Sequence, residues 1–336
     1  MPTMRDVAER AGVSVTTVSH VINETRPVSD ELRTRVLAAI EELGYQPNAL
    51  ARSLRRKKTH TIGMILPDSA NPFFAEVARS IEAVSFEHGY SVILCNTDGD
   101  LEKELLYTDL LVEKRVDGIL FVAAGMSAEH ILALEEQHMP VVVIDRDIPD
   151  VAVDSVLTDN AQGGLLATRH LIELNHRRIG CITGPSDVTP SAERVSGYQQ
   201  ALQENGIPLD ETLIVRGDFQ YESGYRATRH LLALSDPPTA IFACNDLMAI
   251  GAVCAARELG LSVPEDLSIV GFDDIRLASF VNPSLTTIAQ PKHEMGVLAT
   301  QMLLERMQDR DRPPRRQMLS TSLVPRQSTA TRRTEI

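Results

Sequence analysis

This 336-residue sequence lacks the features that mark exported, membrane-spanning or redox-active proteins. It has no apolar run long enough to span a bilayer and no apolar signal segment at its N-terminus. Its four cysteines, Cys95, Cys181, Cys244 and Cys254, lie far apart without a C-x-x-C pair, so we expect buried structural thiols. These absences predict a cytoplasmic protein that binds no membrane and no metal.

The sequence also lacks common catalytic signatures. There is no G-x-x-x-x-G-K-[ST] phosphate loop, no H-E-x-x-H and no G-x-S-x-G. The nine histidines are scattered, and His170 and His176 do not have zinc-ligand spacing, so solvated helix positions are expected for both. We therefore expect a binding protein that has no cofactor and is not an enzyme.

Charge is distributed unevenly along the chain. The net charge of the whole sequence is −13, which taken alone argues against a nucleic-acid partner. Residues 1–58, however, contain ten basic and seven acidic residues, whereas the remainder contains 23 basic and 39 acidic residues. This asymmetry indicates a small basic head followed by an acidic body.

Residues 4–23, MRDVAERAGVSVTTVSHVIN, have the pattern of two short helices joined by a tight turn. Gly12 stands where the turn needs a positive φ, and Ser14 can cap the second helix. Ala8, Gly12 and Val18 have the spacing of a DNA-binding helix-turn-helix, whose second helix enters the major groove. An ordinary helical hairpin is the alternative, and this motif alone does not separate the two.

The second helix carries no formal charge, and side chains outside its apolar stripe can contact base edges through polar and methyl groups. The expected base contacts are Val15, Thr16, Thr17 and His20, with Arg26 after the helix. Basic and polar side chains nearby are expected to contact DNA phosphates. These are Arg5, Asn23, Arg33, Arg52 and Arg55.

A third helix is expected between Ser29, its N-cap, and Gly44, so the helix-turn-helix head occupies residues 1–46. Residues 47–59 follow as a hinge helix and linker, in which PNALARSL allows only about two helical turns, too few for stability in isolation. A charged, flexible linker is the alternative. On DNA, two hinge segments of a dimer are expected to pair and to insert Leu54 into the minor groove.

From Thr61 the pattern changes to short, apolar, β-rich segments that alternate with helical ones. The first series is TIGMIL, SVILCN, DGILFVA and PVVVID, and the second is SVLTD, RIGCITG, TAIFACN and SIVGFDD. Alternation with nearly continuous apolar strands predicts parallel sheets that are covered on both faces. Two such series predict two similar α/β lobes, and a long helix from about Pro291 to Arg310 follows.

Polar and aromatic side chains follow the carboxyl ends of the expected strands, which is where open α/β sheets bind ligands. Carboxylates, guanidiniums and amides can pair with adjacent hydroxyl groups, and an aromatic ring can pack on the C–H face of a sugar. Each residue alone is explained equally well as a turn, helix cap or core residue. Their number favours a ligand site. The candidates are Asn71, Phe73, Phe74, Asp145, Arg146, Arg194, Phe219, Asn245, Asp273 and Gln290.

Several segments carry a resemblance to a known family. They are RDVAERAGVSVTTVSHVIN, YQPNALARSL, HTIGMILPD, EKRVDGILF, ACNDLMAIGAV, SIVGFDDI and PSLTTIAQPKHEMG, which together span nearly the whole chain. The chain resembles the lactose/galactose-repressor family of bacterial transcription regulators. The resemblance implies an all-α helix-turn-helix head that binds a pseudo-palindromic operator. It also implies a body, residues 60–336, with an α/β periplasmic-binding-protein-like fold of two parallel-sheet lobes.

The resemblance further implies how the body is laid out and assembled. The chain is expected to cross between the lobes three times. The N-lobe would comprise about residues 60–160 and 290–322, and the C-lobe about residues 161–289 and 323–330. The tail lacks the leucine heptad with which family members of the lactose-repressor type form tetramers, so a homodimer is expected.

Two groups within the family share motifs with this chain. The head resembles both ribose-operon and purine repressors, and GDFQYESGYRA resembles the purine group. NPFF at 71–74, DR at 145–146 and ND at 245–246 match ribose-binding proteins, and purine repressors lack the first two. The chain is therefore expected to be closest to the ribose-operon repressor. It would be a ligand-controlled transcriptional repressor whose small-molecule effector is D-ribose or a related pentose; a purine-responsive repressor with a purine corepressor is the alternative.

Replacing Thr17 tests whether the second helix reads the major groove. Thr17→Ala removes a side chain that is expected to contact one base pair in each half-site. The substitution should cost about 1–3 kcal/mol there and relax the sequence preference at that position. Fluorescence anisotropy with operator variants that differ at single base pairs measures this. An equal loss of affinity for every operator variant would contradict a direct base contact.

Overall fold

The computed structural model describes residues 2–23, 26–45, 58–122, 128–148, 151–185 and 189–332. The chain divides into two compact units, Met1–His60 and Thr61–Ile336. Three residues with expected hinge contacts, Arg52, Leu54 and Arg55, lie outside the described residues, as does the expected hinge helix.

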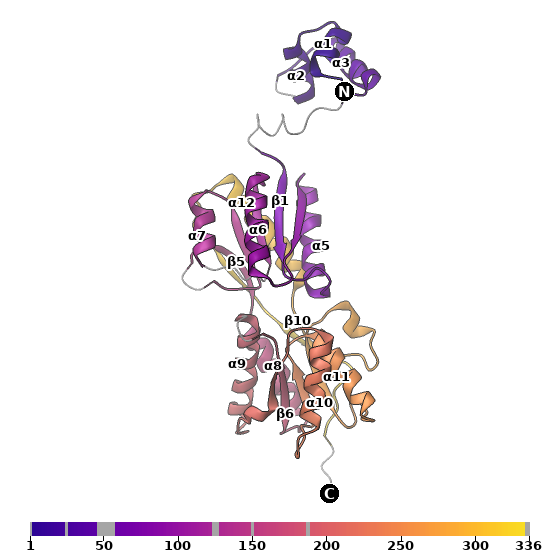
Figure 1. The fold of residues 1–336 in the computed structure, drawn as a ribbon, viewed down its shortest axis with the longest axis vertical. Helices are drawn as coiled ribbons and strands as arrows, with labels where there is room; N and C mark the ends of the chain where they lie inside the picture. The colour runs from indigo at the N-terminus through magenta and orange to yellow at the C-terminus, as the bar shows by residue number, and fades with distance from the viewer. Residues whose placement is uncertain are drawn as a thin grey trace. The chain divides into compact units, whose positions relative to one another are not determined.

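The first unit packs three helices around one small core. They are α1 (Met4–Ala11), α2 (Val15–Asn23) and α3 (Asp30–Leu43) (Figure 1). Val7, Val18 and Val36, one from each helix, are fully buried and form the centre of the core. Arg35 Nη2 on α3 donates a hydrogen bond of 2.6 Å to the Ala11 carbonyl oxygen, so the third helix supports the turn between the first two.

Local capping fixes the ends of these helices. The Thr3 hydroxyl accepts from the Asp6 N–H, and the Asp6 carboxylate accepts from the Thr3 N–H, which together make a capping box at the start of α1. Gly12 ends α1 with a φ of 63°, and the Ser14 hydroxyl accepts from the Thr17 N–H at 3.0 Å, as the sequence predicts. Ser29 holds the N-cap position of α3, but its side chain forms no capping hydrogen bond, contrary to expectation.

The second unit contains two similar α/β lobes (Figure 1). The N-lobe has β1 (Thr61–Leu66), α5 (Pro72–Glu87), β2 (Ser91–Asn96), α6 (Leu101–Glu113), β3 (Gly118–Val122), α7 (Ala128–Glu136), β4 (Val141–Ile144), β5 (Asp154–Thr158), α12 (Lys292–Gln308) and β11 (Arg316–Leu319). The C-lobe has α8 (Asn160–Glu173), β6 (Ile179–Thr183), α9 (Thr189–Glu204), η1 (Glu211–Leu213), β7 (Ile214–Arg216), α10 (Tyr221–Leu232), β8 (Ala240–Ala243), α11 (Asp246–Glu258), β9 (Ser268–Asp273), η2 (Arg276–Ser279), β10 (Thr286–Ala289) and β12 (Ser322–Val324).

Each lobe has one six-stranded sheet. The strand order is β11-β5-β4-β3-β1-β2 in the N-lobe and β12-β10-β9-β8-β6-β7 in the C-lobe. The N-lobe pairs are parallel, and in the C-lobe β12 runs antiparallel to β10. The predicted fold class, an all-α head and a two-lobed α/β body, is therefore confirmed. The sequence did not predict β7 and β11, because β7 has only three residues and β11 is short and mostly exposed.

The chain passes between the lobes after β5, after β10 and after β11. The connections contribute to both lobes at their meeting point. Thr158 at the end of β5 lies 2.8 Å from Gln290, which follows β10. The carboxyl ends of the parallel strands of both sheets therefore meet at this junction, which places their polar end residues around one space.

Two predictions about individual side chains are wrong. Cys254 lies on the outward face of α11 and is exposed, whereas the other three cysteines are buried as expected. His176 is 4% exposed, because its ring nitrogens lie 2.9 Å from Thr239 Oγ1 and 3.0 Å from Ser268 Oγ and so join α8 to the sheet. None of the described helices is long and apolar enough to cross a membrane.

Candidate functional site

A pocket of about 660 Å³ lies between the two lobes of the body. Residues from the ends of β1, β2, β4, β8 and β9 contribute to it, together with the loops and helix starts that follow. The lining residues are Pro67, Asp68, Asn71, Phe73, Phe74, Thr97, Asp98, Gly99, Leu101, Glu104, Asp145, Arg146, Pro185, Pro190, Arg194, Asp218, Phe219, Gln220, Asn245 and Asp273. The pocket is thus polar at several points and aromatic at three, which suits a small polar ligand with an apolar face.

The structure brings nine of the ten candidate ligand residues to this pocket. Gln290 is the exception. It is 4% exposed and lies behind the wall, where its Nε2 donates to Asp273 Oδ1 at 2.8 Å. Its contribution is therefore to orient the Asp273 carboxylate.

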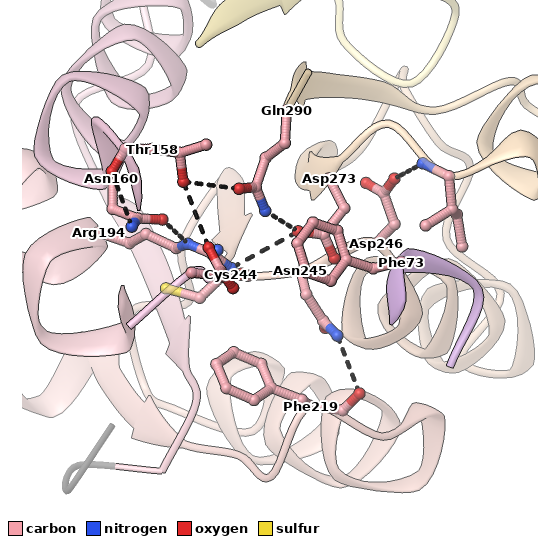
Figure 2. Close-up of polar contacts among 12 residues, drawn as sticks. Phe73, Thr158, Asn160, Arg194, Phe219, Cys244, Asn245, Asp246, Asp273 and Gln290 are labelled. Carbon is pink, nitrogen blue, oxygen red and sulfur yellow. Dashed lines mark hydrogen bonds and ion pairs between the residues drawn. The ribbon is translucent and has the colours of Figure 1, made fainter. Parts of the chain in front are cut away.

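Arg194 is the central cation of the site (Figure 2). Its Nε donates to Asn160 Oδ1 at 2.8 Å and its Nη1 to the Cys244 carbonyl oxygen at 2.6 Å. The guanidinium carbon lies 3.8 Å from the centroid of the Phe272 ring, a cation–π contact. The side chain is 3% exposed and held on three sides, so its orientation is fixed before any ligand binds.

Close packing of two helices gives α9, and with it Arg194, a fixed position. A Cβ atom at Gly164 on α8 would collide with the carbonyl oxygen of Arg194. Glycine is therefore required at this crossing for steric reasons, and any larger residue would push α9 away from the pocket.

A chain of hydrogen bonds joins two of the pocket's carboxylates, those of Asp145 and Asp273 (Figure 2). The Thr158 hydroxyl lies 3.3 Å from Asp145 Oδ1 and 2.8 Å from Gln290 Oε1, and Gln290 in turn contacts Asp273. Asp273 Oδ1 is also 3.7 Å from Arg194 Nη1. The chain crosses from the N-lobe residue Asp145 to the C-lobe residue Asp273, so it links the two halves of the binding site.

Burial disfavours the charged forms of these carboxylates. Loss of water raises the pKa of Asp145 to about 7, although Arg194 opposes the shift and Asp273 adds to it. Burial also raises the pKa of Asp273, again opposed by Arg194. Two buried acids share one guanidinium, so the site has unused capacity for hydrogen-bond donors supplied by a ligand.

Four lining residues adopt left-handed backbone conformations that non-glycine residues rarely take. Their φ angles are 56° at Asp98, 60° at Asp145, 67° at Phe219 and 112° at Asp273. Such conformations cost of the order of 1–3 kcal/mol each and cluster at binding sites, where the surrounding structure holds them. At three pocket carboxylates the backbone is therefore strained. Its conformation serves to place the side chains in the pocket and does not add to the stability of the chain.

The two asparagines of the pocket also cap helices. Asn71 Oδ1 accepts from the Phe73 N–H at 3.0 Å at the start of α5, and Asn245 Oδ1 accepts from the Met248 N–H at 2.9 Å at the start of α11. The Asn245 amide donates to the Phe219 carbonyl oxygen at 2.9 Å, which positions that aromatic residue. Capping and lining are therefore compatible roles for the same side chains.

Sequence reasoning missed one side of the pocket. Thr97, Asp98 and Glu104 follow β2 and line the N-lobe wall, and Glu104 is only 2% exposed. They follow the carboxyl end of SVILCN, so the rule that identified the other candidates also applies to this strand. Asp246, in contrast, has a structural role: it accepts from the Thr287 hydroxyl at 2.6 Å and the Ile275 N–H at 2.8 Å.

The expected base-contacting residues of the head lie on one helix and differ in exposure. Val15 and Thr16 are exposed, whereas Thr17 and His20 are half-buried. The Thr17 hydroxyl lies 2.9 Å from Ser14 Oγ, so the capping residue orients it. The expected phosphate contacts Arg5 and Arg33, and Arg26 after the helix, are exposed; Asn23 Nδ2 donates to the Ser19 carbonyl oxygen at 2.8 Å.

Comparison with known proteins matches both parts of the chain. The sequence model of the bacterial regulatory proteins of the lacI family matches residues 3–48, and that of the periplasmic binding protein-like domain matches residues 168–329. The HTH-type transcriptional repressor PurR of Edwardsiella ictaluri is 45% identical over 332 residues, covering 98% of this chain and 97% of the relative. PurR of Aliivibrio salmonicida is 42% identical over 329 residues, covering 98% and 99%.

Solved structures give the same result. The lac repressor dimer bound to operator and the anti-inducer ONPF is 31% identical with a TM-score of 0.89, covering 98% of this chain and 99% of that one. A LacI family regulator from Enterococcus faecium with bound ribose is 34% identical with a TM-score of 0.76, covering 81% and 100%.

A helix-turn-helix unit joined to a two-lobed ligand-binding body defines a ligand-responsive transcription regulator. The chain belongs to the LacI family of bacterial regulatory proteins. It is a DNA-binding transcriptional repressor that responds to a small molecule, and it is not an enzyme. The resemblance to the lactose/galactose-repressor family is confirmed, but the two relatives at 42–45% identity are PurR repressors, whereas the pocket motifs predict a ribose-operon repressor.

The raised pKa values predict how stability depends on pH. A carboxyl whose pKa is higher in the folded than in the unfolded state holds its proton more tightly when folded, so stability falls as pH rises from about 4 to about 7. The slope is at most about 1.4 kcal/mol per pH unit for one group. Asp145→Asn removes one such group, so the melting temperature of the ligand-free wild type should fall relative to that of the variant between pH 5 and 7.5. Parallel curves would contradict the raised pKa of Asp145.

Proposed function

We propose that the effector of this repressor is a purine base that binds between the lobes beside Asp145, Arg194 and Asp273. The observation that carries the proposal is identity of 42–45% to PurR, the purine repressor, across 97–99% of both chains. The pocket chemistry supports it. Phe74 and Phe219 offer rings for stacking on a planar base, and the buried carboxylates can accept from ring N–H groups.

A pentose is the second candidate, favoured by a specific observation. The ribose-bound regulator from Enterococcus faecium is similar over its whole length. Six carboxylates and the guanidiniums of Arg146 and Arg194 line the pocket, and such groups pair with vicinal hydroxyls. The sequence-based preference for ribose therefore becomes the alternative, and the purine alternative becomes the main proposal.

The effector would act on DNA through the arrangement of the lobes. A ligand that touches both lobes favours one relative orientation of them. β1 of the N-lobe begins at Thr61, directly after the hinge segment, so a change in orientation within a dimer would alter the spacing of the two hinges. A coupling of about 1–3 kcal/mol changes operator affinity severalfold or more. The resemblance to the two groups of the family implies opposite effects. A purine would tighten the binding of the repressor to its operator, and a pentose would release the repressor from the operator.

The operator contacts follow from the exposed face of α2. The proposed base contacts are Val15, Thr16, Thr17, His20 and Arg26, and the proposed phosphate contacts are Arg5, Asn23 and Arg33. Their support is the family match over residues 3–48 and the exposure of most of these side chains.

Isothermal titration with hypoxanthine, guanine and D-ribose tests the effector proposal. The proposal predicts saturable binding of at least one base, tighter than that of ribose, because a planar base stacks more of its surface on a phenylalanine ring than a sugar does. Phe74→Leu should weaken base binding by about 0.5–1.5 kcal/mol. Ribose binding without base binding would replace the proposal with the second candidate, and binding of neither would reject both.

We further propose that the protein is a homodimer that pairs along the β2 edge of the N-lobe. The edge is exposed and apolar: Phe86 on α5, Ile93 and Leu94 on β2, and Leu106 on α6 are 75%, 39%, 45% and 68% exposed. An open apolar edge of this kind is normally covered in a native assembly. The occupant proposed here is a second copy, since the lac repressor relative is a dimer on its operator.

Charge placed on this edge tests the dimer. The combination Ile93→Asp and Leu106→Asp should shift the protein to a monomer in sedimentation velocity and weaken operator binding, because one head contacts only one half-site. Leu209→Asp, an equally exposed apolar residue in the C-lobe, is the matched control and should leave the dimer intact. A double variant that sediments as wild type would move the interface elsewhere.

A further inference from the structure

A buried lysine beside the pocket contacts both of its walls without lining it. Lys292, the first residue of α12, is 8% exposed. Its Nζ donates to the carbonyl oxygens of Asp273 at 2.5 Å and Asp274 at 2.7 Å. It also lies 3.7 Å from Glu76 Oε2 on α5. A buried ammonium is costly unless all its donors are satisfied, and here each of three acceptors takes part.

The two carbonyl groups belong to the most strained turn of the pocket. Asp273 has a φ of 112° and Asp274 a φ of 51°, both unfavourable for residues with a side chain. This turn directs the Asp273 carboxylate toward Gln290 at 2.8 Å and Arg194 at 3.7 Å (Figure 2). The ammonium satisfies both carbonyls at once, so it holds the backbone in a conformation that it would otherwise leave.

Glu76 connects this turn to the opposite wall. It lies one helical turn after Phe73 and Phe74, the aromatic residues of the N-lobe wall. Its Oε2 faces Lys292, and its Oε1 accepts from the Arg276 N–H of the C-lobe at 3.3 Å. The helix that presents the aromatic rings and the turn that presents the carboxylate are therefore tied through one glutamate–lysine pair.

We propose that Lys292 is a positioning residue for effector recognition: it reaches from the N-lobe to the C-lobe turn and fixes the Asp273 carboxylate in the pocket, so that this position depends on the arrangement of the two lobes, and Glu76 of the N-lobe supports the ammonium. The inference rests on the proposed function of the pocket, and it holds for either effector class. Asp273 is then presented correctly only when the lobes stand as they do here. This gives the repressor a direct connection between ligand contact and lobe geometry.

Three variants of the full-length protein separate positioning from general stability. Lys292→Met keeps the length of the side chain and removes the charge, and Lys292→Arg restores a cation. Ser80→Ala is the matched control. Ser80 Oγ lies 3.1 Å from His293 Nδ1, so this substitution removes a different contact between α5 and α12, away from the pocket. Glu76→Gln, alone and combined with Lys292→Met, tests whether the α5 carboxylate supports the Lys292 ammonium.

Hydrogen exchange without any ligand is the first measurement. In Lys292→Met, amides of residues 273–280 should exchange at least about fivefold faster, because the turn opens once its carbonyls lose their donor. Lys292→Arg should restore slow exchange, and Ser80→Ala should match wild type. Unchanged exchange in Lys292→Met would overturn the proposal, whatever the ligand results are.

Titration with hypoxanthine and with D-ribose is the second measurement. For the compound that binds wild type, Lys292→Met should raise the Kd about tenfold or more, with rescue by Lys292→Arg. The effect of Glu76→Gln should be smaller and should vanish in the Lys292→Met background. A wild-type Kd in Lys292→Met would refute the positioning role. If neither compound binds wild type, the effector proposal fails, and the exchange measurement alone decides whether Lys292 is a positioning residue.

Discussion

The burial of Arg194 among groups of the C-lobe is the interaction on which the binding site depends. Its guanidinium contacts a side-chain oxygen at Asn160, a backbone carbonyl at Cys244 and the ring of Phe272, so the protein satisfies it without a ligand. The nearby carboxylates are less well compensated. Burial raises the pKa values of Asp145 and Asp273, and the nearby Arg194 guanidinium only partly opposes this, which leaves the pocket with acceptors for a ligand rich in hydrogen-bond donors.

Burying charged groups in this arrangement lowers the stability of the fold. The packed core of the rest of the body offsets this loss. The two sheets are largely buried, with fully buried residues such as Ile62, Leu120, Phe242 and Phe272 along their strands. Rigid strands with strained ends can hold carboxylates at fixed positions, in the way that P-loops and switch-point sites place polar groups at strand ends. At the β2 edge of the N-lobe, apolar side chains remain exposed, and the proposed second copy of the chain would cover them.

Much of the architecture was predictable from the sequence, because it depends on local patterns. The strand TIGMIL occurs where its apolar pattern places it, and the predicted roles of Gly12 in the turn and of Ser14 as a helix cap are confirmed. The strand-end rule also found nine of the twenty residues that line the pocket. It did not find Glu104, because that residue reads as an ordinary helix glutamate until the fold buries it. Lys292 was missed for a different reason: its partners are backbone carbonyls nearly twenty residues away, and no side-chain motif indicates them.

The identity of the effector could not be predicted from motifs either. Short pocket motifs favour ribose, whereas identity over the whole chain favours the purine alternative.

The most direct test of this account is the operator affinity of the wild type and of Arg194→Met, measured by fluorescence anisotropy with and without the effector identified by titration. The account predicts that both proteins bind operator in the absence of effector, since the head is a separate unit. Effector should change the affinity of the wild type severalfold and leave Arg194→Met unchanged. An Arg194→Met protein whose operator affinity still responds to effector as the wild type does would contradict a sensor built around this buried guanidinium.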